Sequence, residues 1–370
     1  MIIGVPKEIK NNENRVGITP AGVEAFVSRG HKVYIEDKAG VGSGISNEDF
    51  VNAGAEILET AKDVWGQSDM VMKVKEPLPS EYEYFRPGLI LFTYLHLAAE
   101  EELTKALVEN EVVSIAYETV EDVQGRLPLL TPMSEVAGRL AGLMGANFQT
   151  KYNGGAGVLL GGVPGVKPAK VVVVGGGIVG VNAAKMAKGL GGNVTIMDID
   201  PYRMRYLDDI FHGDVDTIMS NNFNIAEQVK DADVVVGAVL IPGAKAPALI
   251  TDEMIKTMKP GSVIVDVAID QGGCVEGIEA TTHDDPVNIR HDVVLYSVAN
   301  MPGSVASTST FALTNATLPY AISLAENGYK KAIDMDPGLA KGMNVYKGKV
   351  VYEAVAEAFD MDYTPLEELL

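Results

Sequence analysis

Three glycines and an aspartate form the most informative pattern in the chain, within the stretch KVVVVGGGIVGVNAAKMAKGLGGNVTIMD at 170–198. Gly175, Gly177 and Gly180 fit the spacing G-x-G-x-x-G. In this motif the first glycine permits a tight turn, the second lets the backbone approach a pyrophosphate, and the third lets a helix pack closely on the strand. The N-terminus of that helix offers free N–H groups and a dipole that favours anions. The pattern therefore predicts a dinucleotide site and hence a redox cofactor.

The elements around these glycines are those that such a site requires. Val171–Val174 is a short β-branched run, which is typical of a parallel strand buried on both faces. Residues from Ile178 to Leu190 have small and apolar side chains at helical spacing, and Asn193–Met197 reads as the next strand. We expect the first helical residues, Ile178 and Val179, to lie at the cofactor.

Asp198 stands 23 positions after Gly175, at the end of the second strand. A carboxylate there accepts a hydrogen bond from a ribose 2′-hydroxyl and repels a 2′-phosphate, so NAD is favoured over NADP. Arg203 and Arg205 follow closely and weaken this preference, and Arg203 is included in the predicted cofactor site. The three glycines alone could mark only a turn. Because a strand precedes them, a helix follows them and Asp198 stands at the expected spacing, the interpretation as a cofactor site is favoured.

Three titratable residues stand at the ends of other apolar segments. Lys75 ends VMKVK, His96 ends LILFTYLH, and Asp270 ends SVIVDVAID. Ligands of open α/β sheets collect at the carboxyl ends of the strands, and an imidazole changes charge near neutral pH, which suits proton transfer. The alternatives stay open at this point. Lys75 and Lys73 could be solvated, His96 could cap a helix or fill the core, and Asp270 could bind turn amides.

Arg15 lies among polar residues in GVPKEIKNNENRVGITP, between a predicted strand and a predicted helix. Its guanidinium could bind a carboxylate through two parallel hydrogen bonds, although an isolated arginine is usually a surface residue. The helix that follows is expected to have Thr19 as its N-cap and Pro20 as its first residue, with a stop at Gly30.

Composition limits the class of protein. The chain has 370 residues, of which 47% are hydrophobic and 22% charged, so it is long enough for two globular domains. A net charge of −20 without a basic cluster would repel nucleic acid and anionic membranes, and we expect neither as a partner.

The apolar stretches are too short for a membrane helix, and MIIGVPKEIK does not resemble a signal peptide. The single cysteine, Cys274, fits a reducing cytoplasm, and no His and Cys cluster suggests a metal.

Strand and helix patterns alternate twice along the chain, which predicts an α/β protein with two Rossmann-like, doubly wound domains. The segment at 307–370 is expected to be mostly helical and too small to enclose a core, so it should return to the N-terminal domain. The outer domain is then discontinuous, with residues 1–129 and 307–370, and the inner domain spans 130–306. Paired helices at 134–152 and 307–327 are expected to join the two.

At this point the chain resembles a known family, the bacterial L-alanine dehydrogenases, which share ancestry with the NAD-binding subunit of proton-translocating transhydrogenase. The stretches that carry the resemblance are GVPKEIKNNENRVGITPAGV at 4–23, KVKEP at 73–77, YLHLA at 94–98, TPMSEVAGRLA at 131–141, the glycine-rich motif, DVAIDQGG at 266–273 and VANMPGSVASTST at 298–310. They are spread over both predicted domains and the C-terminal return.

The resemblance implies an enzyme that oxidatively deaminates L-alanine to pyruvate and ammonium with NAD, and catalyses the reverse reductive amination. It implies that Arg15 binds the substrate carboxylate, that Lys75 contacts the carboxylate or carbonyl oxygen, and that His96 and Asp270 are catalytic. It also implies a homohexamer. The positions that match residues around NAD in that family are Ser134, Ser220, Val239, Leu240, Asn300 and Met301.

Three other interpretations remain. The chain could be a transhydrogenase NAD(H)-binding subunit, or a related dehydrogenase for another substrate, such as a saccharopine dehydrogenase. It could also be a structural protein that only binds NAD, although such a protein would not require charged and titratable residues at the strand ends.

Overall fold

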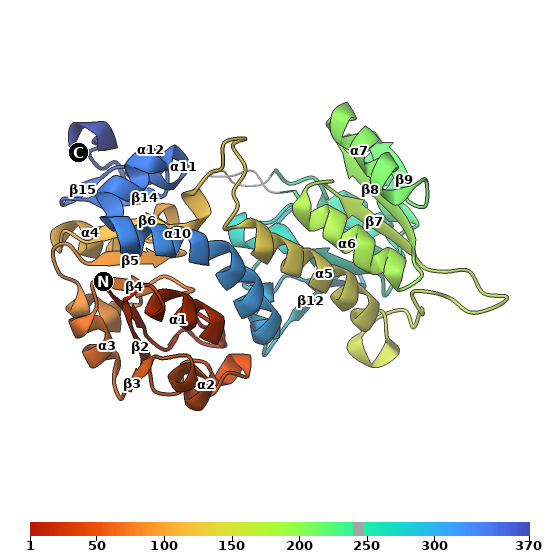
Figure 1. Ribbon diagram of the computed structural model, residues 1–370. Coiled ribbons are helices and arrows are strands. Elements are labelled where there is room, and N and C mark those ends of the chain that lie inside the picture. Colours follow the sequence, from red (N-terminus) through yellow and green to blue (C-terminus); the bar gives the residue numbers. More distant parts are fainter. Residues whose placement is uncertain (240–246) are drawn as a thin grey trace. The chain divides into compact units, whose positions relative to one another are not determined.

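The computed structural model describes residues 1–239 and 247–370 and divides into two compact units (Figure 1). Unit 1 contains Met1–Met133 and Gly303–Leu370, and unit 2 contains Ser134–Pro302. Each unit is built on its own sheet. The predicted α/β class with two doubly wound sheets is confirmed, and each unit is described by itself below.

Unit 1 has an eight-stranded sheet in the order β15-β14-β6-β5-β4-β1-β2-β3. Its strands are β1 (Ile2–Val5), β2 (Lys32–Glu36), β3 (Glu56–Leu58), β4 (Met70–Met72), β5 (Ile90–Thr93), β6 (Val113–Ala116), β14 (Met343–Tyr346) and β15 (Lys349–Val350). The first six strands pair in parallel, whereas β14 and β15 are antiparallel. The parallel part has the doubly wound order 3-2-1-4-5-6, which reverses between β1 and β4.

The helices of unit 1 cover this sheet. They are α1 (Pro20–Val27), α2 (Asn47–Asn52), α3 (Ala61–Gln67), α4 (Glu101–Glu109), α10 (Ala306–Met335), α11 (Pro337–Ala340) and α12 (Glu353–Phe359). Trp65 of α3, Leu107 of α4 and Val355 of α12 share one core cluster with Leu91 of β5. α1 begins as predicted, because Thr19 caps it and Pro20 is its first residue.

Unit 2 has a seven-stranded sheet in the order β12-β13-β11-β10-β7-β8-β9. Its strands are β7 (Lys170–Val174), β8 (Asn193–Asp198), β9 (Asp216–Met219), β10 (Val234–Gly237), β11 (Val263–Asp266), β12 (Val287–Arg290) and β13 (Val293–Tyr296). Six of these strands are parallel, and only β12 is antiparallel. The parallel strands repeat the order seen in unit 1, with the reversal between β7 and β10.

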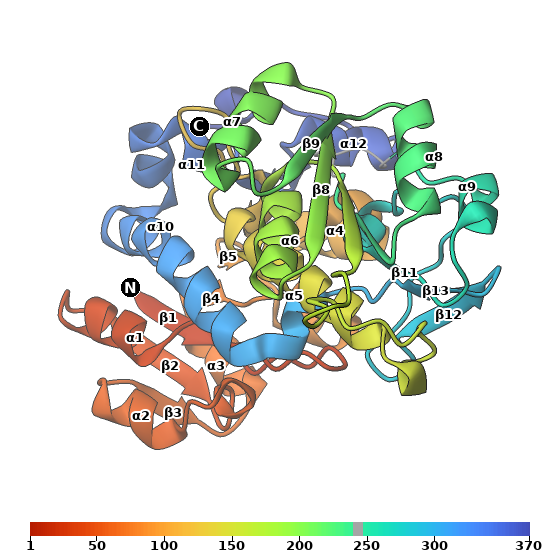
Figure 2. The same ribbon diagram turned by 90° about the vertical axis from the view of Figure 1, so that its right-hand side faces the viewer.

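Helices cover both faces of the second sheet, because alternate residues of its central strand meet different helices. The helices are α6 (Ile178–Gly189), α7 (Pro201–Phe211), α8 (Asn222–Lys230) and α9 (Asp252–Thr257). Val172 and Val174 share a cluster with residues of α8 and α9, which lie side by side (Figure 2). Val173 faces Gly180 of α6. α5 (Thr131–Phe148) begins in unit 1 and continues in unit 2, where its Gly138 and Gly142 lie against α6.

The prediction that residues 307–370 are mostly helical missed β14 and β15. These strands form a hairpin whose turn residues, Lys347 and Gly348, have φ values of 48° and 70°, as a tight hairpin requires. The short edge strands β3 and β12 were also missed; they have only three and four residues, and neither has a buried residue. The predicted helix at 307–327 ends at a real break, since Gly328 interrupts α10 with φ 69°. None of the helices in the described ranges is long and apolar enough to cross a membrane.

Candidate active site

The substrate-side candidates all follow strands at the carboxyl edge of the unit 1 sheet. The loop with Arg15 follows β1, Lys75 follows β4, and His96 follows β5. β1 and β4 are neighbours where the strand order reverses, and ligands of doubly wound sheets bind at this point. Topology therefore brings to one edge segments that are far apart in the sequence.

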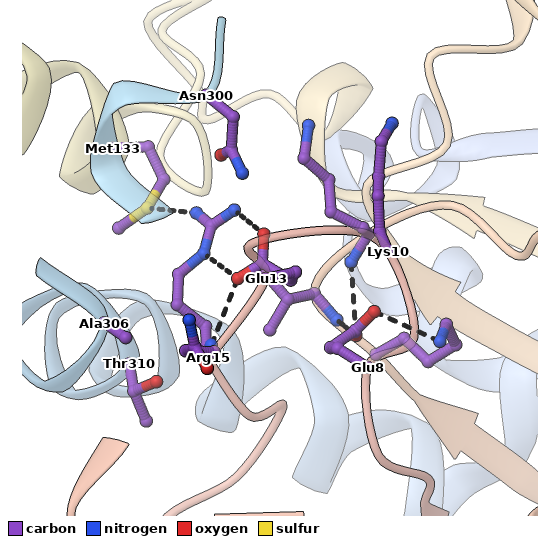
Figure 3. A network of polar contacts seen from close by, with 12 residues as sticks. Glu8, Lys10, Glu13, Arg15, Met133, Asn300, Ala306 and Thr310 are labelled. Carbon is purple, nitrogen blue, oxygen red and sulfur yellow. Dashed lines mark hydrogen bonds and ion pairs between the residues drawn. The ribbon is translucent and has the colours of Figure 1, made fainter. Parts of the chain in front are cut away.

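Arg15 is not a surface residue, since only 2% of it is exposed. Its Nε and Nη2 donate to the two carboxylate oxygens of Glu13 at 2.7 and 2.6 Å, and its Nη1 lies 3.2 Å from the sulfur of Met133 (Figure 3). Burial alone would lower the pKa of Arg15, but the hydrogen bonds and charge of Glu13 outweigh it and raise the pKa. Glu13 therefore holds a charged guanidinium and accepts hydrogen bonds from its Nε and Nη2 groups.

Lys73 and Lys75 have different surroundings, although they are two residues apart. Lys73 is buried and its ammonium lies 3.1 Å from Glu8 and 3.0 Å from Glu81, so the suggestion that it could be solvated is wrong. Burial alone would lower the pKa of Lys73, but the two carboxylates outweigh it and raise the pKa. Lys75 is only half-buried, and among the described residues its ammonium makes no hydrogen bond or ion pair.

Lys75 does not belong to the strand, because β4 ends at Met72. The N–H groups of Val74 and Lys75 donate to Oε1 of Glu8, at 2.6 and 3.3 Å, rather than continuing the strand pairing. The Lys75 carbonyl accepts from Thr93 of β5 at 3.1 Å. Glu8 is itself buried, and burial raises its pKa above the usual value, against the lowering effect of Lys73. The backbone that carries Lys75 is thus held by a buried carboxylate.

His96 lies three residues beyond the end of β5, is exposed, and has a left-handed backbone with φ 51° and ψ 35°. Its ring stacks on Tyr94 with centroids 5.9 Å apart and an interplanar angle of 11°. The hydroxyl of Tyr94 donates to the Leu129 carbonyl at 2.5 Å. The imidazole therefore lies at the sheet edge against a fixed aromatic ring, and the alternative of a core histidine is excluded by its exposure.

The glycine-rich turn of unit 2 has the geometry that the motif requires. Gly175 has φ 105°, and an added Cβ at Gly180 would collide with the Gly175 carbonyl oxygen. Gly177 precedes α6 as its N-cap, and an added Cβ there would meet nothing within 4 Å. The first and third glycines are thus required by the protein itself, whereas the second leaves open space in front of the helix N-terminus. This fits a bound pyrophosphate.

Asp198 ends β8 beside this turn. Its Oδ2 accepts the Gly176 N–H at 2.8 Å and its Oδ1 accepts the Asp200 N–H at 2.9 Å. Arg203 in α7 donates through Nε to the Gly176 carbonyl at 2.5 Å, and the Ser220 N–H donates to the Asp198 carbonyl at 2.9 Å. Asp198, Arg203 and Ser220 therefore gather around the glycine-rich turn.

Asp270 lies beyond a strand that is shorter than predicted. β11 ends at Asp266, and Val267–Gln271 forms a 3₁₀ helix. The role of binding turn amides belongs to the buried Asp266, which accepts from the N–H groups of Ala268, Cys274 and Val275. Asp270 is exposed and accepts the Asn300 N–H at 3.4 Å.

The remaining cofactor candidates are spread over unit 2. Val239 follows β10 and is the side chain that an added Cβ at Gly175 would meet. Ser134 is half-buried on α5, and Met301 is buried in the 3₁₀ helix Met301–Val305. Asn300 has a left-handed φ of 60°. The predicted contact at Leu240 lies outside the described residues.

Sequence reasoning missed the carboxylates that hold these candidates. Glu8 and Glu13 were passed over because acidic residues in a polar loop look solvated, yet both are buried. Glu118 was also missed; it follows β6, and its carboxylate accepts the N–H groups of Leu95 and His96. The available signal was position, since Glu8 and Glu118 follow strands at the same sheet edge as the candidates.

Comparison with known proteins assigns the chain to a family. The family model described as "Alanine dehydrogenase/PNT, N-terminal domain" matches residues 4–137, and the corresponding C-terminal domain model matches residues 141–353. The chain belongs to the alanine dehydrogenase/PNT family. The resemblance inferred from the sequence is thereby confirmed.

Individual members of the family match over nearly their whole length. An alanine dehydrogenase of Methanococcus maripaludis is 63% identical, with all of both chains covered. A solved structure titled L-alanine dehydrogenase is 52% identical with a TM-score of 0.95, covering 97% of this chain and 99% of its own. A solved transhydrogenase from Sinorhizobium meliloti is 25% identical with a TM-score of 0.84, covering 95% and 100%. Among these relatives, the chain is much more similar to the alanine dehydrogenases than to the transhydrogenase.

Proposed function

We propose that the protein catalyses the oxidative deamination of L-alanine to pyruvate and ammonium with NAD, and the reverse reductive amination. The observation that carries this proposal is the 63% identity over the full length to an alanine dehydrogenase. The basic and titratable residues that the reaction needs stand at the carboxyl edge of the unit 1 sheet, which supports it.

Unit 2 is proposed as the NAD domain. The turn at Gly175–Gly180 with the N-terminus of α6 would hold the pyrophosphate, and Asp198 would accept from a ribose hydroxyl. NAD supplies the acceptor for the hydride that leaves Cα of alanine. The other residues proposed to line its site are Ser134, Ile178, Val179, Arg203, Ser220, Val239, Leu240, Asn300 and Met301.

Unit 1 is proposed as the substrate domain. Arg15 would bind the alanine carboxylate through its charged guanidinium, which Glu13 holds in place. Lys75 would bind a carboxylate or carbonyl oxygen, because its ammonium is half-exposed and makes no hydrogen bond or ion pair with described residues. The two cations would together orient the substrate.

Proton transfer is assigned to His96 and Asp270. Loss of hydride from the neutral amine gives an iminium, water adds to it, and the carbinolamine collapses to pyruvate and ammonium. An imidazole at the sheet edge can take the proton from the attacking water and return one to the leaving amine. Asp270, exposed at the end of a 3₁₀ helix, is proposed as the second group that accepts a proton.

The transhydrogenase-type alternative has less support, because the solved transhydrogenase is only 25% identical to this chain. A related dehydrogenase with another substrate remains the nearest competing function. We further propose that the enzyme acts in the cytoplasm as a homohexamer, which the family resemblance and the single cysteine support.

Product analysis tests the function. The purified protein should convert L-alanine and NAD to pyruvate, ammonium and NADH in equal amounts, and each product can be assayed separately. D-Alanine, which has the same chemical groups, is the matched control. When its carboxylate and amine make the same contacts as those of L-alanine, its Cα hydrogen points in a different direction. NADH formation without pyruvate, or equal rates with L-lysine or L-glutamate, would contradict the proposal.

A further inference from the structure

The backbone at His96 adopts a left-handed conformation. Its φ of 51° and ψ of 35° place it in the left-handed region, which is unfavourable for a residue with a Cβ unless surrounding contacts enforce it. His96 is the N-cap of the 3₁₀ helix Leu97–Ala99, and its exposed side chain makes no capping hydrogen bond. Something other than core packing of the imidazole must therefore fix this turn.

Glu118 is the group that contacts this turn. Its Oε1 accepts the His96 N–H at 2.6 Å and the Leu95 N–H at 3.1 Å, and its Oε2 lies 3.3 Å from the same Leu95 nitrogen. A carboxylate that accepts backbone N–H groups makes charge-assisted hydrogen bonds, which are shorter and stronger than neutral ones. The short bond to the His96 nitrogen fits this description.

The fold explains why Glu118 can reach this turn. β5 and β6 are parallel neighbours, with Thr93 paired to Ala116 at their carboxyl ends. His96 comes three residues after Thr93, and Glu118 comes two residues after Ala116, in the 3₁₀ helix Tyr117–Thr119. The two chain segments leave the sheet side by side, and the half-buried glutamate of one binds the backbone of the other.

We propose that Glu118 is a positioning residue for His96: its carboxylate holds the two N–H groups of the left-handed turn and so fixes where the imidazole lies at the sheet edge. Tyr94 limits the ring from one side by stacking, and the glutamate fixes the backbone that carries it. This inference rests on the proposed catalytic role of His96. The carboxylate of Glu118 is proposed to act only through the backbone of Leu95 and His96.

The test is a double-mutant cycle on kcat for reductive amination, measured at high enzyme concentration. We expect Glu118→Ala to lower kcat on the order of 10- to 100-fold, because small misplacement of a catalytic group has effects of this size. NADH affinity, measured by fluorescence titration, should not change. In the His96→Ala background the same Glu118→Ala change should cost nothing further, since a residue that acts only through His96 has no effect without it.

Two further variants keep the test independent of folding. Glu118→Gln retains an oxygen that can accept both N–H groups, whereas Glu118→Asp retains the charge on a shorter side chain. We expect the Gln variant to be the more active of the two, because its oxygen still reaches both N–H groups through weaker, neutral hydrogen bonds, whereas the shorter Asp side chain does not reach them. Glu121→Gln is the matched control; Glu121 lies three residues further along and pairs with Lys341, and its kcat should equal that of the wild type.

The outcomes separate the inference from the proposed function. An equal loss of kcat from Glu118→Ala in both backgrounds, or a Gln variant no more active than the Asp variant, would overturn the positioning role. A His96→Ala enzyme with wild-type kcat would instead remove His96 from the proposed mechanism, and the inference would fall with it.

Discussion

Each of the three basic residues proposed to act on the substrate is held by a different glutamate. Glu13 binds the guanidinium of Arg15, Glu8 binds the backbone N–H of Lys75, and Glu118 binds the backbone N–H of His96. Only Arg15 has its charged group engaged by its glutamate; for the other two the contact is to the backbone. The backbone that carries the ammonium and the imidazole is therefore held without the hydrogen-bonding groups of these side chains being used.

Arg15→Lys tests the carboxylate contact at the residue level. One ammonium cannot reproduce the planar guanidinium, and a hydrogen bond to a charged group is worth about 1.5–3 kcal/mol, so KM for pyruvate should rise roughly 10- to 100-fold. Steady-state rates at saturating NADH and ammonium give this value. Arg29→Lys, at an exposed pair with Glu326, is the control. An unchanged pyruvate KM in the Arg15 variant would contradict the assignment.

Asp198→Asn tests the choice of cofactor. The amide oxygen can still accept the Gly176 N–H, but the negative charge that would repel a 2′-phosphate is lost. We expect the ratio of kcat/KM for NADPH to that for NADH to rise at least about tenfold, which corresponds to about 1.4 kcal/mol of removed repulsion. Asp200→Asn, which keeps the N-cap of α7, should leave the ratio unchanged. An unaltered ratio in the Asp198 variant would remove this residue from cofactor selection.

At the level of elements, the turn between β7 and α6 contains glycines with two different roles. Gly175 and Gly180 are required by the fold, whereas Gly177 is proposed to contact the pyrophosphate. Gly177→Ala fills only open space, so the thermal midpoint should stay close to that of the wild type. NADH binding should weaken by about 1–3 kcal/mol, the cost of displacing or losing a pyrophosphate contact, as measured by titration. Gly189→Ala, also facing open space but at the far end of α6, should bind NADH normally. Equal NADH affinity in both variants would argue against a pyrophosphate at Gly177.

The Glu8–Lys73–Glu81 cluster joins the segments after β1 and β4 to the 3₁₀ helix Pro79–Tyr84. Lys73→Met would leave two buried carboxylates without their cation, which costs about 3–5 kcal/mol of unfolding free energy at neutral pH. Urea denaturation measures this loss. Lys105→Met, at a fully exposed pair with Glu101, is the control and should leave the unfolding free energy essentially unchanged.

The pH dependence of that loss follows from the directions of the pKa shifts. Burial raises the pKa of Glu8 even with Lys73 present, and removing the cation raises it further. A carboxyl with a raised folded-state pKa gives stability that is present below its unfolded value, about 4.3, and lost as the pH rises through the folded value. The deficit of the Lys73→Met variant should therefore shrink on acidification toward pH 4. A deficit that does not depend on pH would indicate a packing effect instead.

The sequence predicted elements whose signals are local, and it failed where tertiary contacts decide. The strands predicted at Val171–Val174 and Asn193–Met197 agree with β7 and β8 to within one residue, and Thr19 with Pro20 marked the start of α1. The ends of β4 and β11 were set too late, because Glu8 accepts the N–H of Val74 and Asp266 accepts the N–H of Ala268, which the apolar pattern assigns to the strands. The strand ends in the sequence predicted that Lys75 and His96 lie near the carboxyl edge of the sheet. No local signal reveals that the backbone of each residue is held by a glutamate that follows a different strand.

At the scale of the whole molecule, both sheets contain six parallel strands in the same doubly wound order, each with antiparallel additions at one edge. In unit 1 the candidates follow β1, β4 and β5, and in unit 2 the glycine-rich turn follows β7 and Val239 follows β10. In both units the candidate residues thus lie at the carboxyl edge of the sheet, near the point where the strand order reverses. These residues are cationic in unit 1 and include the glycines of the turn in unit 2. The same topology thereby carries the edge proposed for the substrate in unit 1 and the edge proposed for the dinucleotide in unit 2.

The most direct test of the account is the initial rate of NADH oxidation by the purified protein with ammonium and pyruvate. Glyoxylate, 2-oxobutyrate and 2-oxoglutarate replace pyruvate in parallel assays, and NADPH replaces NADH. We predict rapid turnover that requires ammonium, is fastest with pyruvate and is lost with NADPH. Absence of turnover in a protein that still binds NADH, or a clear preference for 2-oxoglutarate, would contradict the proposed alanine dehydrogenase activity.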